Sequence, residues 1–427
     1  MKPSKRAIIY HFLLLRFRRV FFDHQISPFL KRQWKKNLRK STFYRQYLDR
    51  DTPFPVINKT VFMESFDEIN TVGIRKEEAM HLALQSEVSR DFSPMINGIS
   101  IGLSSGTSGS RGMFLTSKKE QERWVAAILD RVIGFSFKKR SVAFFLRANN
   151  NLYEAVGSRL LQFHFYDIKT SVDTYIPLLL ERQHDLLVAQ PSVLQVIAAH
   201  YEQHGLVSSF TKVISVAEVL EEDMKARFEA VFNCPVHQVY QCTEGFLAYT
   251  CSKGNLHFNE DFLKIEKKYL DDEKVRFHPI ITDYQRTSQP VVRYELNDIL
   301  HEGGPCTCGS KTTVIKKIEG RADDVFTFHR EGETIRIYPD FIRRAIIQVT
   351  DDLENYQVSR VGAYALELVL YPKSEKDLVS LFEKVKGSLQ QLFQSYGIAE
   401  ISITLHSRDH NPINKFKRIN NEYAKKL

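Results

Sequence analysis

Several features that would mark a secreted or membrane-spanning protein are missing from this sequence. Its 427 residues contain only five cysteines, an odd number that argues against a framework of paired disulfides. The apolar stretch Ala7–Phe17 follows a basic start, but it is too short to span a bilayer and no small-residue cleavage site follows it. We therefore expect a protein of the reducing cytoplasm.

Repeats, low-complexity tracts and nucleic-acid-binding motifs are also missing, so we predict no nucleic-acid partner. What the chain does have is apolar material, with 30 phenylalanines and 18 tyrosines. Such a composition excludes an intrinsically disordered protein. Because 427 residues exceed what one core usually supports, we expect a large domain and a smaller one.

The formal net charge is +9, which favours anionic partners such as nucleotides, coenzyme A, an acidic carrier protein or a membrane surface. Much of the excess lies between Lys2 and Lys40. The N-terminal stretch has the pattern of a basic amphipathic helix that makes peripheral membrane contact. A terminal helix docked on its own domain explains the pattern equally well.

Between Asn97 and Tyr240, short apolar runs alternate with helical stretches, which is typical of a mostly parallel sheet. Helices are predicted over Lys118–Ile133 and Glu221–Phe232, and from Pro191 with Ser192 available as a cap. The predicted strands are Ile99–Leu103, Val142–Leu146, Leu160–Tyr166, Leu186–Ala189, Val213–Val216 and Val236–Tyr240.

Beyond Glu244 the pattern changes to extended runs, which predict a separate β-rich subregion. These runs are Leu256–Ile265, Val275–Thr282 and Pro290–Leu296. From about Gly320, one helix, two strands, a long helix and a final strand predict a small α+β domain: Pro339–Gln348, Tyr356–Val361, Ala365–Tyr371, Ser374–Tyr396 and Glu400–His406. The predicted α/β organisation is a helical region over 1–96, the main part of the large domain over 97–320, and a small domain over 321–427.

The most specific motif is a loop rich in hydroxyls and glycines between two apolar runs. It contains Ser104, Ser105, Gly106, Thr107, Ser108, Gly109, Ser110, Arg111 and Gly112. Glycines let backbone N–H groups approach an anion and hydroxyls add donors, so a polyphosphate suits this loop. No Gly-Lys-Ser/Thr closes it and a strand follows, which excludes a Walker loop.

The segment Ser104–Gly109 resembles the phosphate loop of the acyl-adenylate-forming superfamily, and most of all its phenylacetate–CoA ligase and coenzyme-F synthetase branch. Further motifs follow in the order of that family. Tyr240, Thr243 and Glu244 match Tyr-Gly-x-Thr-Glu, in which the threonine contacts the α-phosphate region and the glutamate holds Mg²⁺. Glu218 matches the loop that lines the adenine and acyl pocket.

Downstream, the resemblance implies that Asp298 grips the ribose, Arg321 contacts the nucleotide and Asp323 is the hinge between a large domain and a small mobile one. The segment Asn414–Ile419 resembles the one that supplies the catalytic lysine, here Lys415, with Lys417 as a rival. Each residue also has a structural explanation: Asp298 as a turn cap, Arg321 paired with Asp323 or Asp324, Lys415 as a surface lysine.

The sequence departs from the family pattern in three of its motifs. Ser110 and Arg111 replace the usual lysine, so Arg111 is predicted to neutralise the β- and γ-phosphates. Gln241 and Asn414 replace glycines. These changes leave the prediction of adenylation in place but leave the second half-reaction less defined.

The resemblance implies an enzyme that uses ATP and Mg²⁺ to activate a carboxylic acid as its acyl-adenylate, and then passes the acyl group to coenzyme A or a carrier-protein thiol. By resemblance Arg147–Tyr153 lies near the acyl pocket, which favours an aromatic or hydroxylated acid; a polar turn is an equal explanation. Transfer of AMP to a hydroxyl and a non-catalytic nucleotide-binding regulator are the alternatives. The presence of both Glu244 and Lys415 speaks against the regulator.

A metal site outside these motifs is also predicted. Cys251 and His257 form one short-range pair, and Cys306 and Cys308 another. Two such pairs suit a tetrahedral structural zinc, because each can be presented by one tight loop. The alternative is that the cysteines are small apolar residues of the core.

Overall fold

The computed structural model describes residues 3–21, 25–50, 52–89, 91–104, 112–134, 138–146, 161–168, 170–330, 332–350, 352–372, 378–406 and 417–424. The chain forms two compact units. Unit 1 comprises Met1–Leu296 and Leu300–Ile318, and unit 2 comprises Asn297–Ile299 and Glu319–Leu427. Each is described by itself below.

Unit 1 begins with helices. They are α1 (Lys5–Phe21), α2 (Pro28–Leu38), α3 (Thr42–Asp49), α4 (Lys59–Glu64), α5 (Phe66–Ile69) and α6 (Lys76–Ser89). The side chains of Ser27, Ser41 and Asn58 accept hydrogen bonds from the first turns of α2, α3 and α4, which explains where these helices start.

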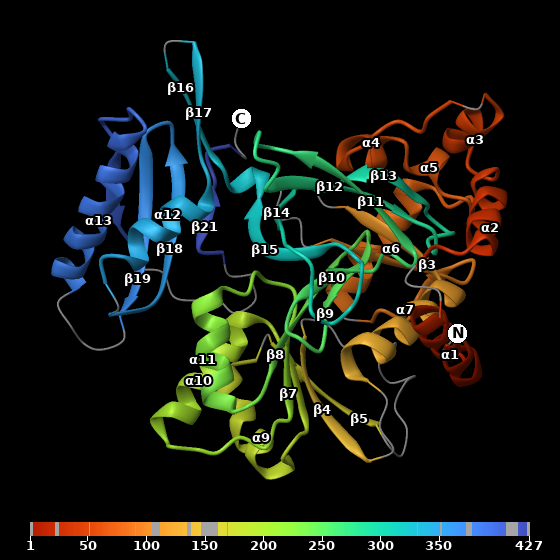
Figure 1. Ribbon diagram of the computed structural model, residues 1–427, viewed down its shortest axis with the longest axis horizontal. Coiled ribbons are helices and arrows are strands. Elements are labelled where there is room, and N and C mark those ends of the chain that lie inside the picture. The colour runs from red at the N-terminus through yellow and green to blue at the C-terminus, as the bar shows by residue number, and fades with distance from the viewer. Residues whose placement is uncertain are drawn as a thin grey trace. The chain divides into compact units, whose positions relative to one another are not determined.

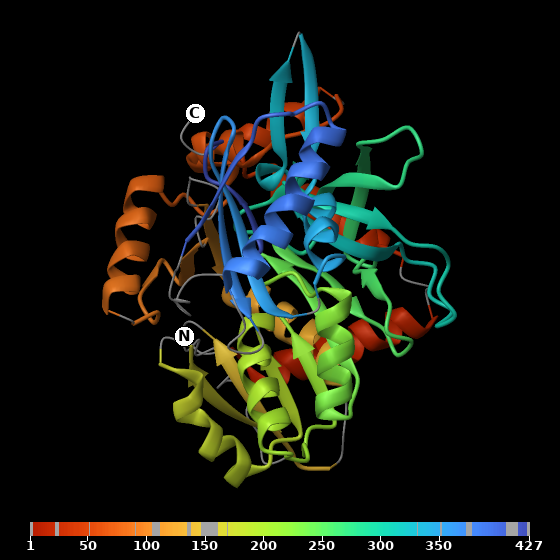
Figure 2. The ribbon, with the colours of Figure 1, turned by 90° about the vertical axis from the view of Figure 1, so that its left-hand side faces the viewer.

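A small antiparallel sheet follows, formed by β1 (Met95–Ile96), β2 (Ile99–Leu103) and β3 (Met113–Ser117). Its apolar side packs with Phe66 and Ala79 of the preceding helices. Helix α6, drawn in orange in Figure 2, lies beside this sheet. The prediction that Ile99–Leu103 belongs to the parallel sheet is therefore wrong. Because β2 and β3 are joined by a loop of only nine residues, they pair antiparallel with each other.

The parallel part of the main sheet contains β4 (Arg140–Leu146), β5 (Leu161–Asp167), β6 (Leu186–Ala189), β7 (Lys212–Ser215) and β8 (Val236–Cys242), in the order β5-β4-β6-β7-β8. Its helices are α7 (Lys118–Ile128), α9 (Ile176–Arg182), α10 (Pro191–Gln203) and α11 (Glu222–Phe232), with a π-helical turn over Leu129–Ile133 and a 3-10 turn over Val172–Tyr175. The predicted parallel sheet is confirmed for these strands.

Helices cover both faces of this sheet. Successive side chains of a strand point to opposite sides, so neighbouring residues of one strand pack against different helices. Ala143 and Phe145 of β4 pack with α10 and α11, whereas Val142 and Phe144 pack in the core shared with α1 and α7. Figure 1 shows these two pairs of helices on opposite sides of the strands. Burial on both faces explains the apolar runs within these strands, which are Val142–Phe145 in β4, Leu186–Ala189 in β6 and Val213–Ile214 in β7.

The later strands continue the same sheet. They are β9 (Gly245–Thr250), β10 (Leu256–Phe258), β11 (Leu263–Tyr269), β12 (Arg276–Asp283), β13 (Val291–Glu295), β14 (Asp298–Glu302) and β15 (Val314–Arg321). The expected β-rich subregion is present, but it is not separate: β9 pairs antiparallel with β8, so the sheet runs on from the parallel strands. Leu256–Ile265 is two strands, since Asn259–Phe262 forms a turn between them.

Two helix starts differ in how they are capped. Ser117 and Glu120 form a capping box at α7. Helix α10 starts at Pro191 after Gln190, without a side-chain cap, so the prediction that Ser192 caps it is wrong. Ser192 lies inside the first turn, where its hydroxyl donates to Glu218 instead, at 3.1 Å.

Unit 2 contains a 3-10 turn over Ala322–Asp324, the hairpin β16 (Phe326–Arg330) and β17 (Glu333–Ile337), α12 (Pro339–Ile347), β18 (Leu353–Gly362), β19 (Ala365–Pro372), α13 (Leu378–Ser395), β20 (Ser402–Leu405) and β21 (Ile419–Asn421). The sheet order is β20-β19-β18-β21. Both helices contribute to its core, with Ile342, Val385 and Phe393 fully buried. The expected α+β order is confirmed; the β16–β17 hairpin was not predicted.

Candidate functional site

Thr243 and Glu244 form the two-residue turn that joins β8 to β9, because Cys242 pairs directly with Gly245. The Glu244 carboxylate accepts hydrogen bonds from the Thr243 hydroxyl at 2.8 Å and from the Tyr294 hydroxyl of β13 at 3.0 Å. Within the described ranges, no lysine or arginine forms an ion pair with Glu244. The two contacts that orient this carboxylate thus come from neutral hydroxyl groups.

A second acid lies beside this turn. Asp283, at the end of β12, is fully buried, and burial raises its pKa to about 6 although the Gln285 amide and Arg286 favour its charged form. Its Oδ2 is 3.2 Å from the position that a Cβ on Gly245 would occupy. Any side chain at position 245 would therefore crowd this carboxyl, which gives a reason for glycine after Glu244.

Glu218 joins two loops at the carboxyl edge of the parallel strands. Its carboxylate accepts from the Ser192 amide and hydroxyl, each at 3.1 Å, so the loop after β7 is tied to the start of α10 after β6. Ala217 has φ 68°, a left-handed conformation that is strained for alanine. Crevices outside the carboxyl ends of such strands are where open α/β sheets bind ligands.

The base of the predicted phosphate loop is closed by Ser104 and Gly112. The Ser104 amide donates to the Gly112 carbonyl, and the Gly112 amide donates to the Ser104 hydroxyl, both at 2.7 Å. A Cβ on Gly112 would lie 3.1 Å from Cε of Lys59, so a lysine from α4 reaches this base. The other predicted loop residues, Ser105, Gly106, Thr107, Ser108, Gly109 and Arg111, lie outside the described residues, as does Arg147–Tyr153.

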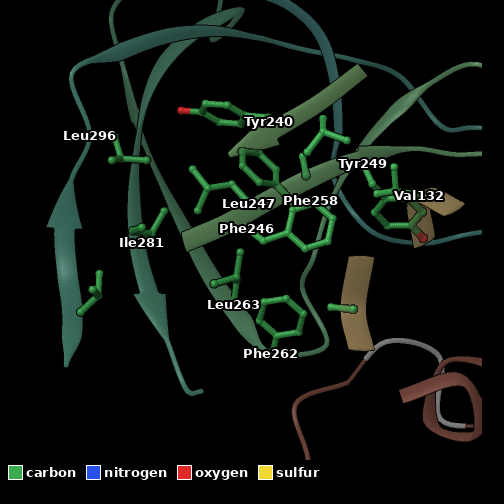
Figure 3. Close-up of a cluster of buried hydrophobic side chains, with 14 of the residues drawn as sticks. Val132, Tyr240, Phe246, Leu247, Tyr249, Phe258, Phe262, Leu263, Ile281 and Leu296 are labelled. Atoms are coloured by element: carbon green, nitrogen blue, oxygen red, sulfur yellow. The ribbon is translucent and has the colours of Figure 1, made fainter. Parts of the chain in front are cut away.

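Tyr240, predicted to contact ATP, is 7% exposed and belongs to the main hydrophobic core. Figure 3 shows its ring at the edge of a cluster that includes Phe246, Leu247 and Phe258, with the hydroxyl pointing away from them. Its ring therefore contributes to the packing of the core.

In unit 2, the turn after β15 brings several predicted residues together. The Asn297 side chain donates to the Asp323 carboxylate, and the Ala322 amide donates to the Asn297 carbonyl at 2.8 Å. Arg321 lies 3.8 Å from Asp323, which matches the structural explanation considered for this arginine. Asp298 begins β14 and directly follows Asn297, the residue that contacts this turn.

Of the two candidate lysines, Lys415 and Lys417, the structure describes the contacts of Lys417. Lys417 donates to both oxygens of the buried Asp324, at 3.0 and 2.8 Å. Lys415 lies outside the described residues. Because its charge is already balanced inside unit 2, Lys417 is the weaker candidate for a lysine that must meet a substrate.

The four predicted zinc ligands meet in one place. Ligand atoms of Cys251, His257, Cys306 and Cys308 all lie within 4.8 Å of one another. The sulfurs of Cys251 and Cys306 are 3.7 Å apart, and the sulfur of Cys308 is 3.5 Å from Nε2 of His257. Cys251 lies in the turn between β9 and β10, and His257 lies in β10 itself. Cys306 and Cys308 lie in the turn before β15.

Neighbouring donors fix the positions of these side chains. The amide of Lys253 donates to Cys251 Sγ at 3.4 Å, and the amide of Cys308 and the side chain of Asn255 donate to Cys306 Sγ at 3.4 and 3.2 Å. Nδ1 of the buried His257 is 3.0 Å from the Thr312 hydroxyl, which leaves Nε2 facing the cluster.

The pKa values of the two neighbouring thiols diverge. Burial raises the pKa of Cys306, but hydrogen bonds from Cys308, His257 and Asn255 outweigh this and bring it to about 6. Burial raises the pKa of Cys308 to about 11, with Cys306 and Cys251 acting in the same direction. The Cys306 thiolate therefore forms readily, whereas the Cys308 thiol needs a nearby cation to become charged.

No family model matches the sequence. Among curated proteins, the chain is 26% identical over 224 residues to Protein CapK of Staphylococcus aureus, covering 51% of this chain and 49% of that protein. The alignment thus spans about half the length of that relative.

Solved structures match over more of the chain. The 2-hydroxyisobutyryl-CoA ligase, in the postadenylation state in complex with R3-HIB-AMP, has a TM-score of 0.61 at 15% identity, covering 99% of this chain and 91% of that one. The amide bond synthetase McbA from Marinactinospora thermotolerans has a TM-score of 0.51 at 12% identity, covering 88% and 91%. Fatty acyl-adenylate ligases from E. coli and L. pneumophila give 0.53 at 13%, covering 74% and 68%.

The chain therefore has the fold of the acyl-adenylate-forming ligases, with a large N-terminal and a small C-terminal part, as the sequence motifs predicted.

Two contacts at this site were not predicted. Tyr294 lies four residues before Asp298, but nothing in the sequence indicated that its hydroxyl reaches Glu244. Ser192 was interpreted as a helix cap rather than as a partner of Glu218. Both are contacts between segments far apart in the chain, so local patterns carry no signal for them.

Proposed function

We propose that this protein is an ATP-dependent ligase that condenses a carboxylic acid with ATP to an acyl-adenylate, releases pyrophosphate, and then passes the acyl group to coenzyme A or another thiol. The observation that carries the proposal is the Glu244 carboxylate, oriented by Thr243 and Tyr294 and unpaired with any described cation, in a chain with the fold of acyl-adenylate-forming ligases. A cytoplasmic location, where ATP and coenzyme A occur, is part of the proposal.

The chemistry needs charge neutralisation, because a carboxylate must approach the α-phosphorus of a triphosphate. Mg²⁺ held by Glu244 would supply positive charge there. The residues of this chain that we assign to the same task are Arg111 for the β- and γ-phosphates and Lys415 for the reacting oxygens. Ser104 and Gly112, bonded to each other, hold the two ends of the loop at a fixed separation.

For the acid and the acceptor, we propose only a chemical class. The neighbour proteins act on chemically different acids, so fold does not select among them. An aromatic or hydroxylated acid is the first class to test, as the sequence suggested. Transfer of AMP to a hydroxyl differs from thioester formation in its product, since AMP would then be retained in the product rather than released.

An ATP–pyrophosphate exchange assay with a panel of acids tests the proposal, because exchange requires reversible adenylation. We expect exchange with at least one acid, and a fall of at least about a hundredfold in Glu244→Gln, which keeps the size of the side chain but removes its charge. Glu222→Gln, at an exposed position on α11, is the matched control. ATP binding by a folded wild-type chain without exchange for any acid would favour a nucleotide-binding regulator.

We also propose that Cys251, His257, Cys306 and Cys308 bind a structural zinc ion. With zinc bonds of about 2.3 Å to sulfur and about 2.0–2.1 Å to nitrogen, a tetrahedral site puts two sulfurs about 3.8 Å apart and sulfur and nitrogen about 3.6 Å apart. The distances of 3.7 and 3.5 Å support this geometry. Four protein ligands leave no open position, so the role is to join the two turns.

A further inference from the structure

Helix α1 has two apolar faces rather than one. One face packs into unit 1, where Ile8 and Leu15 are buried in the core shared with α7. The other face is exposed to solvent and is almost continuous along the helix: Ile9, Tyr10, Leu13, Leu14, Phe17, Val20 and Phe21. At 1.5 Å per residue, this face is roughly 18 Å long.

Polar contacts on the inner side hold α1 in place. Arg19 forms an ion pair with Asp130 at 2.9 Å, and the Ser4 amide donates to the Glu122 carboxylate at 2.7 Å. Arg18 donates to the carbonyls of Gln25 and Asp261 at 3.0 and 3.4 Å. The outer face is thus presented by a helix that is anchored at both ends, which argues against a loose terminal segment that happens to be exposed.

Exposed apolar side chains are costly unless they meet a partner, and a contiguous set of seven is more than a surface normally carries. Phe29, at the start of α2, adds another ring that is 68% exposed. Figure 1 shows α1 and α2 at the same edge of unit 1.

Positive charge is concentrated in the same segment. The first forty residues contain twelve lysines and arginines and a single acid, Asp23, so their surplus exceeds the net charge of +9 of the whole chain. The basic side chains of α2 and the residues after it are exposed: Lys31, Arg32, Lys35, Lys36, Arg39 and Lys40. On α1, Arg6 and Arg16 are exposed as well.

We propose that α1 and α2 dock this protein on an anionic phospholipid surface, with the outer face of α1 inserted among the lipid headgroups. An apolar stripe flanked by arginines and lysines is the combination that interfacial helices use, since apolar burial and attraction to anionic lipids add together. A second copy of this chain is a poor occupant, because two such basic segments would repel each other. None of the helices in the described ranges has the length and low charge needed to cross a bilayer.

Vesicle co-sedimentation of the full chain tests this proposal. We expect binding to phosphatidylcholine vesicles that contain about a third phosphatidylglycerol, and weakening in about 0.5 M salt because exposed charges are then screened. The triple variant Ile9→Ser, Leu13→Ser and Phe17→Ser should lower the vesicle partition constant at least about tenfold. These side chains are exposed, so the fold should persist.

The matched control is Val88→Ser with Val207→Ser, which removes two highly exposed apolar side chains elsewhere on unit 1 and should leave vesicle binding unchanged. Equal binding by the wild type and the triple variant would overturn the proposal, and so would a failure to bind anionic vesicles. So would a dimer that the triple variant abolishes, because the face would then be a subunit interface. Pyrophosphate exchange without vesicles should be unaffected by the triple variant, which separates this test from that of the ligase.

Discussion

Lys415 and Lys417 lie two positions apart in the segment that resembles the catalytic lysine motif. The structure describes the contacts of Lys417, whereas Lys415 lies outside the described residues. Lys417 is 2.8 Å from Asp324, whose side chain is 6% exposed. Removing one partner of such a pair leaves a buried charge without compensation. Lys417 is therefore expected to contribute to the stability of unit 2, and Lys415 to catalysis.

The corresponding prediction compares two alanine variants. Lys415→Ala should lower pyrophosphate exchange by at least about a hundredfold with ATP binding largely kept, because the charge is needed mainly in the transition state. Lys417→Ala should retain exchange but lose about 1–3 kcal/mol of unfolding free energy. Activity assays and denaturant titrations measure the two effects. A folded but inactive Lys417→Ala together with an active Lys415→Ala would reverse the assignment.

Other contacts at the residue scale depend on precise placement. The Thr243–Glu244 turn was predicted as a motif, but its orientation depends on Tyr294, fifty positions away. Likewise, Asp283 reaches the turn only because β12 lies in the same sheet as β8 and β9. Local sequence patterns thus predicted the reactive groups, whereas the pairing of strands brings their contact partners close to them.

At the scale of elements, two turns of the main sheet bring the Cys-His pairs together. Both turns lie where β10 joins β9 and β15, since Leu256 pairs with Thr250 on one side and with Ile315 on the other. The sheet register thus determines that the pair at 251 and 257 meets the pair at 306 and 308. A zinc ion at this point would join two loops in a region of the sheet that has few helices to stabilise it.

The prediction is that purified protein contains close to one zinc per chain. Cys306→Ser should lose the metal and lower the melting temperature by at least about 5 °C, because metal affinity is folding free energy when the site exists only in the folded state. Cys234→Ser, at a buried cysteine outside the cluster, should keep the metal and serves as the control.

A chelator provides a second measurement on the unmodified chain. Removal of zinc should lower the melting temperature of the wild type, and added zinc should restore it. Metal-free protein with an unchanged melting temperature would disprove the structural zinc site.

At the scale of the whole molecule, the chain consists of two compact units, and the resemblance assigns Asp323 as the hinge between the domains. Asp323 is the second residue of a 3-10 turn, where its carboxylate accepts from Asn297. Proline fits a helical φ of this kind but cannot leave it. A substitution here therefore tests whether the second half-reaction needs the backbone to change.

Asp323→Pro should keep pyrophosphate exchange within a few-fold of the wild type, while thioester formation falls by about tenfold or more. Asp323→Ala is the control, because it also loses the bond to Asn297 but leaves φ free. Measuring exchange and thioester product separately distinguishes the two half-reactions. Equal loss of both in the proline variant, or equal behaviour of the two variants, would remove the hinge assignment.

The sequence by itself determined the fold class, the strands β4 to β8, the order of elements from α12 to β20 in unit 2 and the types of residue at the site. It could do so because strand and helix periodicity, turn residues and the hydroxyl-glycine loop are local properties, read within a few positions. The spacing of the Cys-His pairs was local in the same way.

Only the tertiary structure decided which of these local features meet. It joined the β-rich strands to the parallel ones through β8 and β9, and made β2 and β3 a separate hairpin. It also decided which apolar residues of α1 are covered, because packing against α7 buries Ile8 and Leu15 and leaves Leu13 and Phe17 exposed. Burial depends on partners that are distant in the chain, and no local pattern encodes them.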